Sequence, residues 1–139
     1  MITKHSILAS IFFLITIISF GNEGDIKLDL NDEKEEIFTS KDKDFLQQWH
    51  YQQILKMEIT ENERDEYFSR LNQFTYKMSR LGLPKYYYTD AERKHEFERL
   101  VAKLDAAMKN SLSPSNYIIH HESFDRIEDI VYEKRNWDE

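Results

Sequence analysis

The sequence predicts an all-α fold, either a small bundle or a curved hairpin of about four amphipathic helices. From Phe45 onward, apolar residues recur at steps of three and four, which places them on one face of a helix. Hydroxyl residues suited to capping a helix precede three of these stretches. The 139 residues include only three glycines and two prolines, which leaves little material for a turn-rich β fold.

The first 21 residues have the pattern of a secretory signal peptide. Lys4 gives a basic start, residues 6–20 carry no charge, and the small residues Ser19 and Gly21 suit cleavage after Gly21. The uncharged run is shorter than the roughly 18–20 residues that a spanning helix needs. We therefore expect a periplasmic or secreted protein with no stable membrane span after cleavage. An uncleaved anchor is the alternative.

Residues 22–44 read as an acidic leader, which we expect to be disordered. The segment holds nine acids, four lysines and few large apolar side chains. The whole chain has 26 acids and 19 basic residues, a net charge of −7, which becomes −8 when Lys4 leaves with the signal peptide. Because this balance repels polyanions, we expect no nucleic acid as a partner. The chain has no cysteine, so its stability depends on packing without disulfides.

The helical domain is predicted to span residues 45–139. Phe45 and Trp49 outline its first helix, and Thr60 caps a second helix whose apolar residues recur at steps of four, three, four and three. Gly82 is predicted to end this second helix as a left-handed C′ residue. The stripe consists of Tyr67, Leu71, Phe74, Met78 and Leu81.

The third and fourth helices are also predicted to begin at hydroxyl residues. Thr89 and Glu92 form a capping box, whereas Ser113 caps the fourth helix with Pro114 at its first position. The third stripe is Phe97, Leu100, Val101, Leu104 and Met108, and the fourth is Tyr117, His121, Phe124, Ile127 and Val131.

The second helix also predicts self-association. It carries bulky residues along its whole stripe, and a small four-helix domain covers only part of such a stripe. We therefore expect a homodimer, and an elongated one if its long helices pair antiparallel.

One helix-start phrase occurs twice in the chain. Each copy joins an aliphatic residue to a hydroxyl N-cap, with a polar side chain three positions after the cap. Such a side chain can reach back to the amide of the N-cap residue and close a capping box. The copies are Ile59, Thr60 and Glu63, and Leu112, Ser113 and Asn116.

In an exported, all-α chain without cysteine, these phrases resemble the repeated Leu-Thr-x-x-Gln motifs of the Spy/CpxP-like periplasmic proteins. The similarity covers roughly residues 45–137, with Glu63 and Asn116 where the family has Gln and Ser113 where it has Thr. The resemblance implies a curved helical hairpin arrangement that dimerises into a cradle. It also implies ATP-independent binding of unfolded proteins, or a role in the envelope stress response.

The resemblance further implies a client-binding surface that mixes basic and apolar residues. Basic residues lie near the apolar stripe of the second helix, and three tyrosines follow that helix with large contact area at little entropic cost. The other interpretation is a solvated helix face for the basic residues and closure of the bundle end for the rings. The candidates are Arg70, Lys77, Arg80, Tyr86, Tyr87 and Tyr88.

A metal site is the weaker alternative. His121 and Asp125 lie four apart and share one helix face, but zinc needs three or four converging ligands. His120 points about 100° away from its neighbour and is expected to face water, with His121 at the rim of the core. We expect no cofactor.

Three functional hypotheses follow. The first is a Spy-like chaperone or stress protein that binds unfolded or envelope proteins. The others are a metal-responsive periplasmic sensor and a structural or adaptor subunit of an envelope complex. The chain has no catalytic motif such as Gly-x-Ser-x-Gly or His-Glu-x-x-His, so we do not expect an enzyme.

Overall fold

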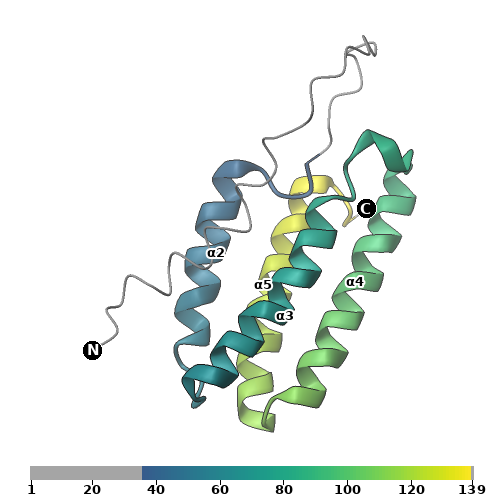
Figure 1. The fold of residues 1–139 in the computed structure, drawn as a ribbon. Coiled ribbons are helices and arrows are strands. Elements are labelled where there is room, and N and C mark those ends of the chain that lie inside the picture. The colour runs from purple at the N-terminus through teal and green to yellow at the C-terminus, as the bar shows by residue number, and fades with distance from the viewer. Residues whose placement is uncertain (1–35, 139) are drawn as a thin grey trace, which may run out of the picture. The chain divides into compact units, whose positions relative to one another are not determined.

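The computed structural model describes residues 36–138, which form a bundle of four helices (Figure 1). Consecutive helices run antiparallel; α2 packs against α5, α3 against α4, and α4 against α5. No strand occurs within the described residues, so the all-α prediction is confirmed in its bundle form. The elements are α2 (Ser40–Ile54), α3 (Glu61–Ser79), the 3-10 helix η2 (Pro84–Tyr86), α4 (Asp90–Ser111) and α5 (Pro114–Arg135).

The predicted signal peptide and most of the predicted acidic leader lie outside the residues that the structure describes. Within residues 36–138, no helix combines the length and the apolar character that a membrane crossing requires.

The helix starts predicted at Thr60, Thr89 and Ser113 are confirmed. The Thr60 hydroxyl accepts a hydrogen bond from the Glu63 amide at 3.3 Å, and the Glu63 carboxylate accepts one from the Thr60 amide at 2.7 Å. Thr89 and Glu92 form the same capping box before α4. Ser113 caps α5 by accepting from the amide of Asn116 at 3.4 Å, but the Asn116 side chain does not close a capping box, because it bonds to the backbone of Glu58 at 3.2 Å. These contacts satisfy amides that a helix leaves free at its N-terminus.

α2 begins at Ser40 rather than at Phe45, inside the segment predicted to be a leader. The Thr39 hydroxyl accepts a hydrogen bond from the Asp42 amide at 3.3 Å, and Ile37 is buried beside this start. The ammonium of Lys134 lies 2.8 Å from the Asp42 carboxylate and joins the start of α2 to the end of α5. The acidic composition of this segment therefore led to a prediction of disorder where a capped helix begins.

α3 ends without the left-handed glycine that the sequence suggested. The amide of Leu81 donates to the Met78 carbonyl at 3.2 Å, and the amide of Leu83 donates to the Arg80 carbonyl at 3.1 Å. No glycine within residues 36–138 has a positive φ, so the predicted role of Gly82 is wrong. These i→i+3 hydrogen bonds pair carbonyl groups that the end of α3 would otherwise leave free. The chain then continues directly into η2.

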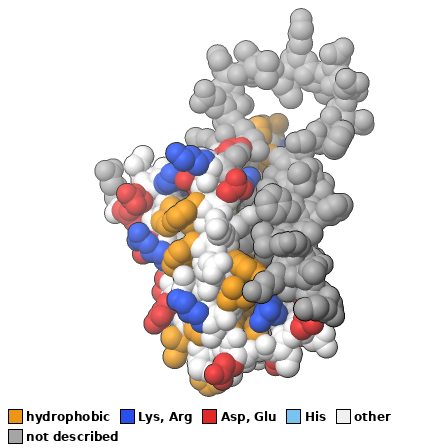
Figure 2. Space-filling view, turned by 90° about the vertical axis from the view of Figure 1, so that its left-hand side faces the viewer, with side chains coloured by type: hydrophobic (Ala, Val, Ile, Leu, Met, Phe, Trp, Pro, Cys, Tyr) orange, Lys and Arg blue, Asp and Glu red, His pale blue; other side chains and the backbone are white. Residues whose placement is uncertain are grey.

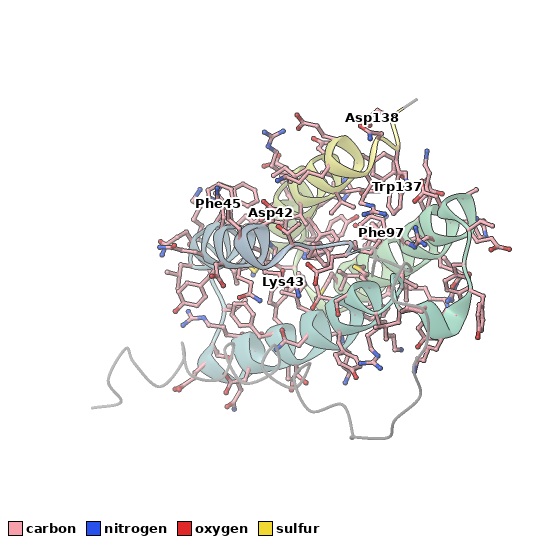
Figure 3. All side chains as sticks on the ribbon, turned by 90° about the horizontal axis from the view of Figure 1, so that it is seen from above. Asp42, Lys43, Phe45, Phe97, Trp137 and Asp138 are labelled. Carbon is pink, nitrogen blue, oxygen red and sulfur yellow. The ribbon has the colours of Figure 1, made fainter. Side chains whose placement is uncertain are left out.

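The core is apolar where α3, α4 and α5 meet. Phe97, Leu104 and Met108 of α4 are fully buried. Trp137, beyond the end of α5, packs on Phe97 with ring centroids 5.7 Å apart (Figure 3). Burial of such side chains is the main stabilising term for a helical bundle without disulfides.

The apolar stripe of α3 is covered within the chain. Tyr67, Leu71, Met78 and Leu81 are all buried, and Phe74 is half-buried against the same core. The stripe therefore does not by itself require a second chain, and the homodimer stays a prediction.

The buried face of α5 is rotated from the predicted one. His120 is 1% exposed, whereas His121 lies at the surface, so the expectation that His120 faces water is wrong. Adjacent side chains on a helix point about 100° apart, so only one of the two histidines can face the core. A polar partner inside the core makes His120 the buried one. The buried residues of α5 are Asn116, His120, Ser123, Phe124, Ile127 and Val131.

Candidate functional site

The leading candidate is a basic and aromatic surface on the last turns of α3 and on the connection through η2. Residues 67–89 contain four basic residues and no acid, although the chain as a whole has a net charge of −7. The segment therefore concentrates positive charge on an acidic protein. We call it the aromatic–cationic surface; its side chains are Arg70, Phe74, Tyr76, Lys77, Arg80, Lys85, Tyr86, Tyr87 and Tyr88.

Three of its cations lie over aromatic rings. The Lys77 ammonium is 5.7 Å from the ring centroid of Phe74, and the Arg80 guanidinium is 5.2 Å from that of Tyr76. The Lys85 ammonium is 4.9 Å from the ring centroid of Tyr86. At exposed sites each such contact contributes about 0.5–1 kcal/mol. Charge and apolar surface are thus held side by side before any partner arrives.

Helical spacing places four side chains of this surface on the side of α3 away from the core, whereas Phe74 is half-buried against the core. At 100° per residue, Tyr76, Arg80, Lys77 and Arg70 cover an arc of about 120°. The buried Leu71 and Met78 lie on the other side of the helix. Tyr76 is 40% exposed, so this arc presents a ring as well as three cations.

Tyr87 is the most unusual residue of the surface. Its side chain is 90% exposed, and its backbone has φ 52° and ψ 27°, in the left-handed region. A residue with a Cβ is held there at a cost of about 1–2 kcal/mol. The rings of Tyr86 and Tyr88 stack at 5.5 Å on either side of it in sequence, and the Tyr87 amide donates to the Pro84 carbonyl at 3.0 Å. These contacts hold a strained turn that projects one tyrosine into solvent.

The six predicted client-binding residues lie on α3 or on the chain that follows it. Lys77, Arg80 and Tyr86 take part in the cation–ring contacts, and Tyr88 is half-buried against the core. The cation contacts of Phe74, Tyr76 and Lys85 were not predicted from the sequence. A usable signal was present, because an acid-free run of this length is unexpected in a chain with 26 acids.

Other large apolar side chains are exposed outside this surface. Within residues 36–138 they are Phe45 (63% exposed), Leu55 (43% exposed) and Ile118 (54% exposed). On the side of the bundle that α2 borders, hydrophobic side chains reach the surface between charged ones (Figure 2). Scattered apolar exposure of this kind is ordinary for a folded protein.

The predicted metal candidates are engaged with each other. His121 Nδ1 is 3.0 Å from the Asp105 carboxylate, and His121 Nε2 is 3.5 Å from the Asp125 carboxylate. The Tyr117 hydroxyl donates to Asp105 at 2.8 Å, and its ring stacks on that of His121. Within residues 36–138, no group of three or more His, Cys, Asp or Glu side chains is placed to hold a metal. The described residues thus give the metal hypothesis no donor set.

A chain of buried polar side chains joins α2, α3 and α5. His50 Nδ1 lies 2.6 Å from the Ser123 hydroxyl, and His50 Nε2 lies 2.8 Å from the Tyr67 hydroxyl. The Tyr67 hydroxyl is in turn 2.7 Å from His120 Nδ1. All four side chains are at most 4% exposed. We call these four residues the polar layer.

The electrostatics of the polar layer favour neutral histidines. Burial lowers the pKa of His50 to about 3, with a further contribution from the charge of His120. Burial also lowers the pKa of His120 to about 4; Asp105 opposes this shift and His121 adds to it. Burial raises the pKa of Tyr67 as well. Near pH 7 the layer is an uncharged hydrogen-bonded network.

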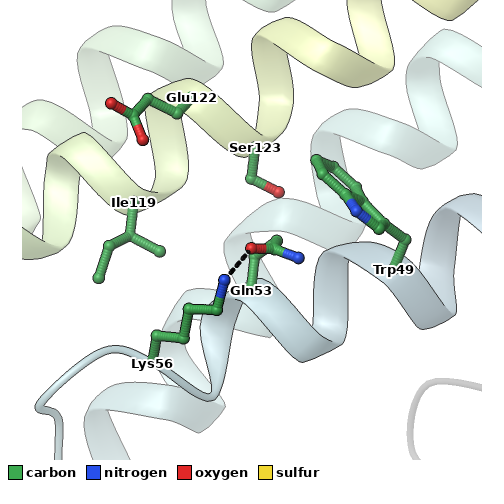
Figure 4. Close-up of a pocket in the computed structure, with 6 residues that line it drawn as sticks. All are labelled: Trp49, Gln53, Lys56, Ile119, Glu122 and Ser123. Atoms are coloured by element: carbon green, nitrogen blue, oxygen red, sulfur yellow. Dashed lines mark hydrogen bonds between the residues drawn. The ribbon is translucent and has the colours of Figure 1, made fainter.

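A shallow pocket lies beside Ser123. Its walls come from α2, the turn after it and α5, and the Lys56 ammonium donates to the Gln53 side-chain oxygen at 2.6 Å (Figure 4). The Ser123 hydroxyl is bonded to His50, a pairing that also occurs in hydrolases. Ser123 lies within α5, however, where backbone amides bond to helix carbonyls and are not free to stabilise an oxyanion. We therefore assign the pair to core hydrogen bonding. The lining residues are Trp49, Gln53, Lys56, Ile119, Glu122 and Ser123.

Comparison with protein-family models, with curated proteins and with solved structures gave no match to this chain.

Proposed function

We propose that this protein binds polypeptides through the aromatic–cationic surface, as an exported ATP-independent chaperone or envelope-stress protein would. The observation that carries the proposal is the acid-free segment 67–89, which places four basic residues and exposed tyrosines together on an acidic chain. Tyrosine and arginine are the side chains that most often dominate protein interfaces.

The side chains of the aromatic–cationic surface indicate which kind of polypeptide it would bind. Cations held over rings favour a segment that presents carboxylates next to aromatic or aliphatic side chains. The remainder of the protein is acidic and repels such a segment. Electrostatic steering would therefore direct the segment toward α3 and η2. The partners proposed are therefore unfolded or envelope polypeptides with acidic and apolar residues interspersed.

Light scattering from an aggregating client protein tests the proposal. We expect the purified protein to slow aggregation at a several-fold molar excess without ATP. Replacement of Lys77, Arg80 and Lys85 by Gln should remove much of this effect. A matched variant replaces Lys41, Lys103 and Arg126, which are exposed elsewhere, and it has the same net charge.

Two results would count against the proposal. Equal protection by both triple variants would show that the aromatic–cationic surface is not the binding site. Absence of protection, with one stoichiometric partner recovered from the envelope, would favour the adaptor hypothesis instead. Sizing chromatography in the same experiment tests the predicted homodimer.

A further inference from the structure

α2 is attached to the bundle through a stripe that has a titratable residue at its centre. Leu46, His50 and Ile54 are its buried residues, spaced one turn apart. His50 therefore lies between the two apolar contacts, where bundles usually place another aliphatic side chain. α4, by contrast, contributes Phe97, Leu100, Leu104 and Met108 to an apolar core, whereas α3 and α5 supply Tyr67, His120 and Ser123 to the polar layer.

We propose that the polar layer makes the attachment of α2 acid-sensitive, so that protonation of His50 and His120 releases α2 from α3 and α5 while the other three helices stay packed. This inference goes beyond polypeptide binding and does not depend on it. It assigns the buried histidines a regulatory role that the sequence did not suggest.

The hydrogen bonds of the layer explain why added protons are poorly accommodated. Tyr67 has one hydroxyl hydrogen and faces a ring nitrogen of each histidine. With neutral rings, the Tyr67 hydroxyl donates to one of these nitrogens and accepts from the N–H of the other, so both hydrogen bonds can form. With both rings charged, His50 Nε2 and His120 Nδ1 each direct a hydrogen at the same oxygen. The hydroxyl hydrogen of Tyr67 then has no acceptor in the layer.

The surrounding charged groups do little to stabilise a positive charge on His50 or His120. Tyr67 is the titratable group that faces the layer from α3, and Asp105 acts on His120 from α4. The Asp105 carboxylate is occupied by Tyr117 and His121 of α5, and His121 itself disfavours a charge on His120.

Lys56, in the turn after α2, and Glu122 of α5 line the pocket beside Ser123. Within residues 36–138, the side chains that hydrogen-bond to His50 and His120 are the neutral hydroxyls of Ser123 and Tyr67.

The release of α2 frees both histidines to bind protons near pH 6.5, whereas the packed state holds their pKa values near 3 and 4. Proton linkage for two such groups favours the released state by about 500-fold more at pH 5 than at pH 7. Local opening of this kind is expected where an element has few buried apolar contacts.

Hydrogen exchange, with rates corrected for intrinsic pH dependence, tests the proposal on the unmodified protein. We expect α2 amides to lose most of their protection between pH 7 and pH 5 while α4 amides keep theirs. Loss of protection in both helices together, or in neither, would overturn the inference. His50→Gln with His120→Gln should abolish the response, and the matched change at exposed His95 should leave it intact.

The two tryptophans give a second measurement. Trp49 lies on α2 and Trp137 packs on α4, so the variants Trp137→Phe and Trp49→Phe each retain one local reporter. We expect Trp49 emission to shift at higher pH than Trp137 emission, with an uptake of about two protons. Coincident transitions would contradict a local release.

Discussion

Tyr67→Phe removes one buried oxygen and tests whether the polar layer is bonded as described. The hydroxyl lies 2.8 Å from a ring nitrogen of His50 and 2.7 Å from one of His120, so its loss leaves two buried nitrogens without a partner. Each unsatisfied group costs about 1–3 kcal/mol, and the change in packing volume is small. We therefore expect a destabilisation of about 2–6 kcal/mol, a large share of the roughly 5–15 kcal/mol typical of a domain.

The measurement is urea unfolding at pH 7, followed by circular dichroism at 222 nm. Tyr117→Phe is the control, because its hydroxyl also has a partner but lies near the surface, where water replaces the bond to Asp105. We expect that variant to lose less than about 1 kcal/mol. A Tyr67→Phe variant within 0.5 kcal/mol of the unmodified protein, about the usual surface range, would refute the hydrogen-bond assignment.

Three further predictions concern the surface turn, the caps and pH. Tyr87→Asn should leave the melting temperature unchanged or higher, because Asn tolerates the left-handed region, yet it should weaken client protection in the scattering assay. Thr60→Ala should cost about 1 kcal/mol in urea unfolding, as loss of a capping box requires, whereas an unchanged midpoint would contradict the cap. The pKa values of His50 and His120 are lower in the folded state, so stability is complete above pH 7 and falls as the unfolded histidines protonate, by about 4 kcal/mol at pH 5. Urea midpoints that do not change over that interval would exclude neutral buried histidines.

The parts of the fold that could be predicted are those that local chemistry determines. Thr60, Thr89 and Ser113 each accept from the amide three residues further on, so their role is visible in short stretches of sequence. The start of α2 was missed although Thr39 and Asp42 form a cap, because the acidic composition around them suggested disorder.

The polar layer could not be predicted because its members are distant in the sequence. His50, Tyr67 and His120 are brought together by three different helices, and no local pattern links them. His120 and His121 are equally polar, so residue type does not show which of them is buried. The orientation of α5 depends instead on this contact. The aromatic–cationic surface was found in part, because its basic residues and tyrosines are close in the chain, but the pairing of cations with rings needed the three-dimensional positions.

Fluorescence anisotropy with a synthetic peptide tests the proposed function most directly. The peptide contains Glu, Phe, Ser and Gly, and a second peptide has Lys in place of Glu. We expect the Glu peptide to bind, with affinity reduced about tenfold when Lys77, Arg80 and Lys85 become Gln, and with further loss in high salt. The variant at Lys41, Lys103 and Arg126 should bind it as the unmodified protein does. Equal binding of the Glu and Lys peptides, or equal loss in the two triple variants, would contradict recognition by the aromatic–cationic surface.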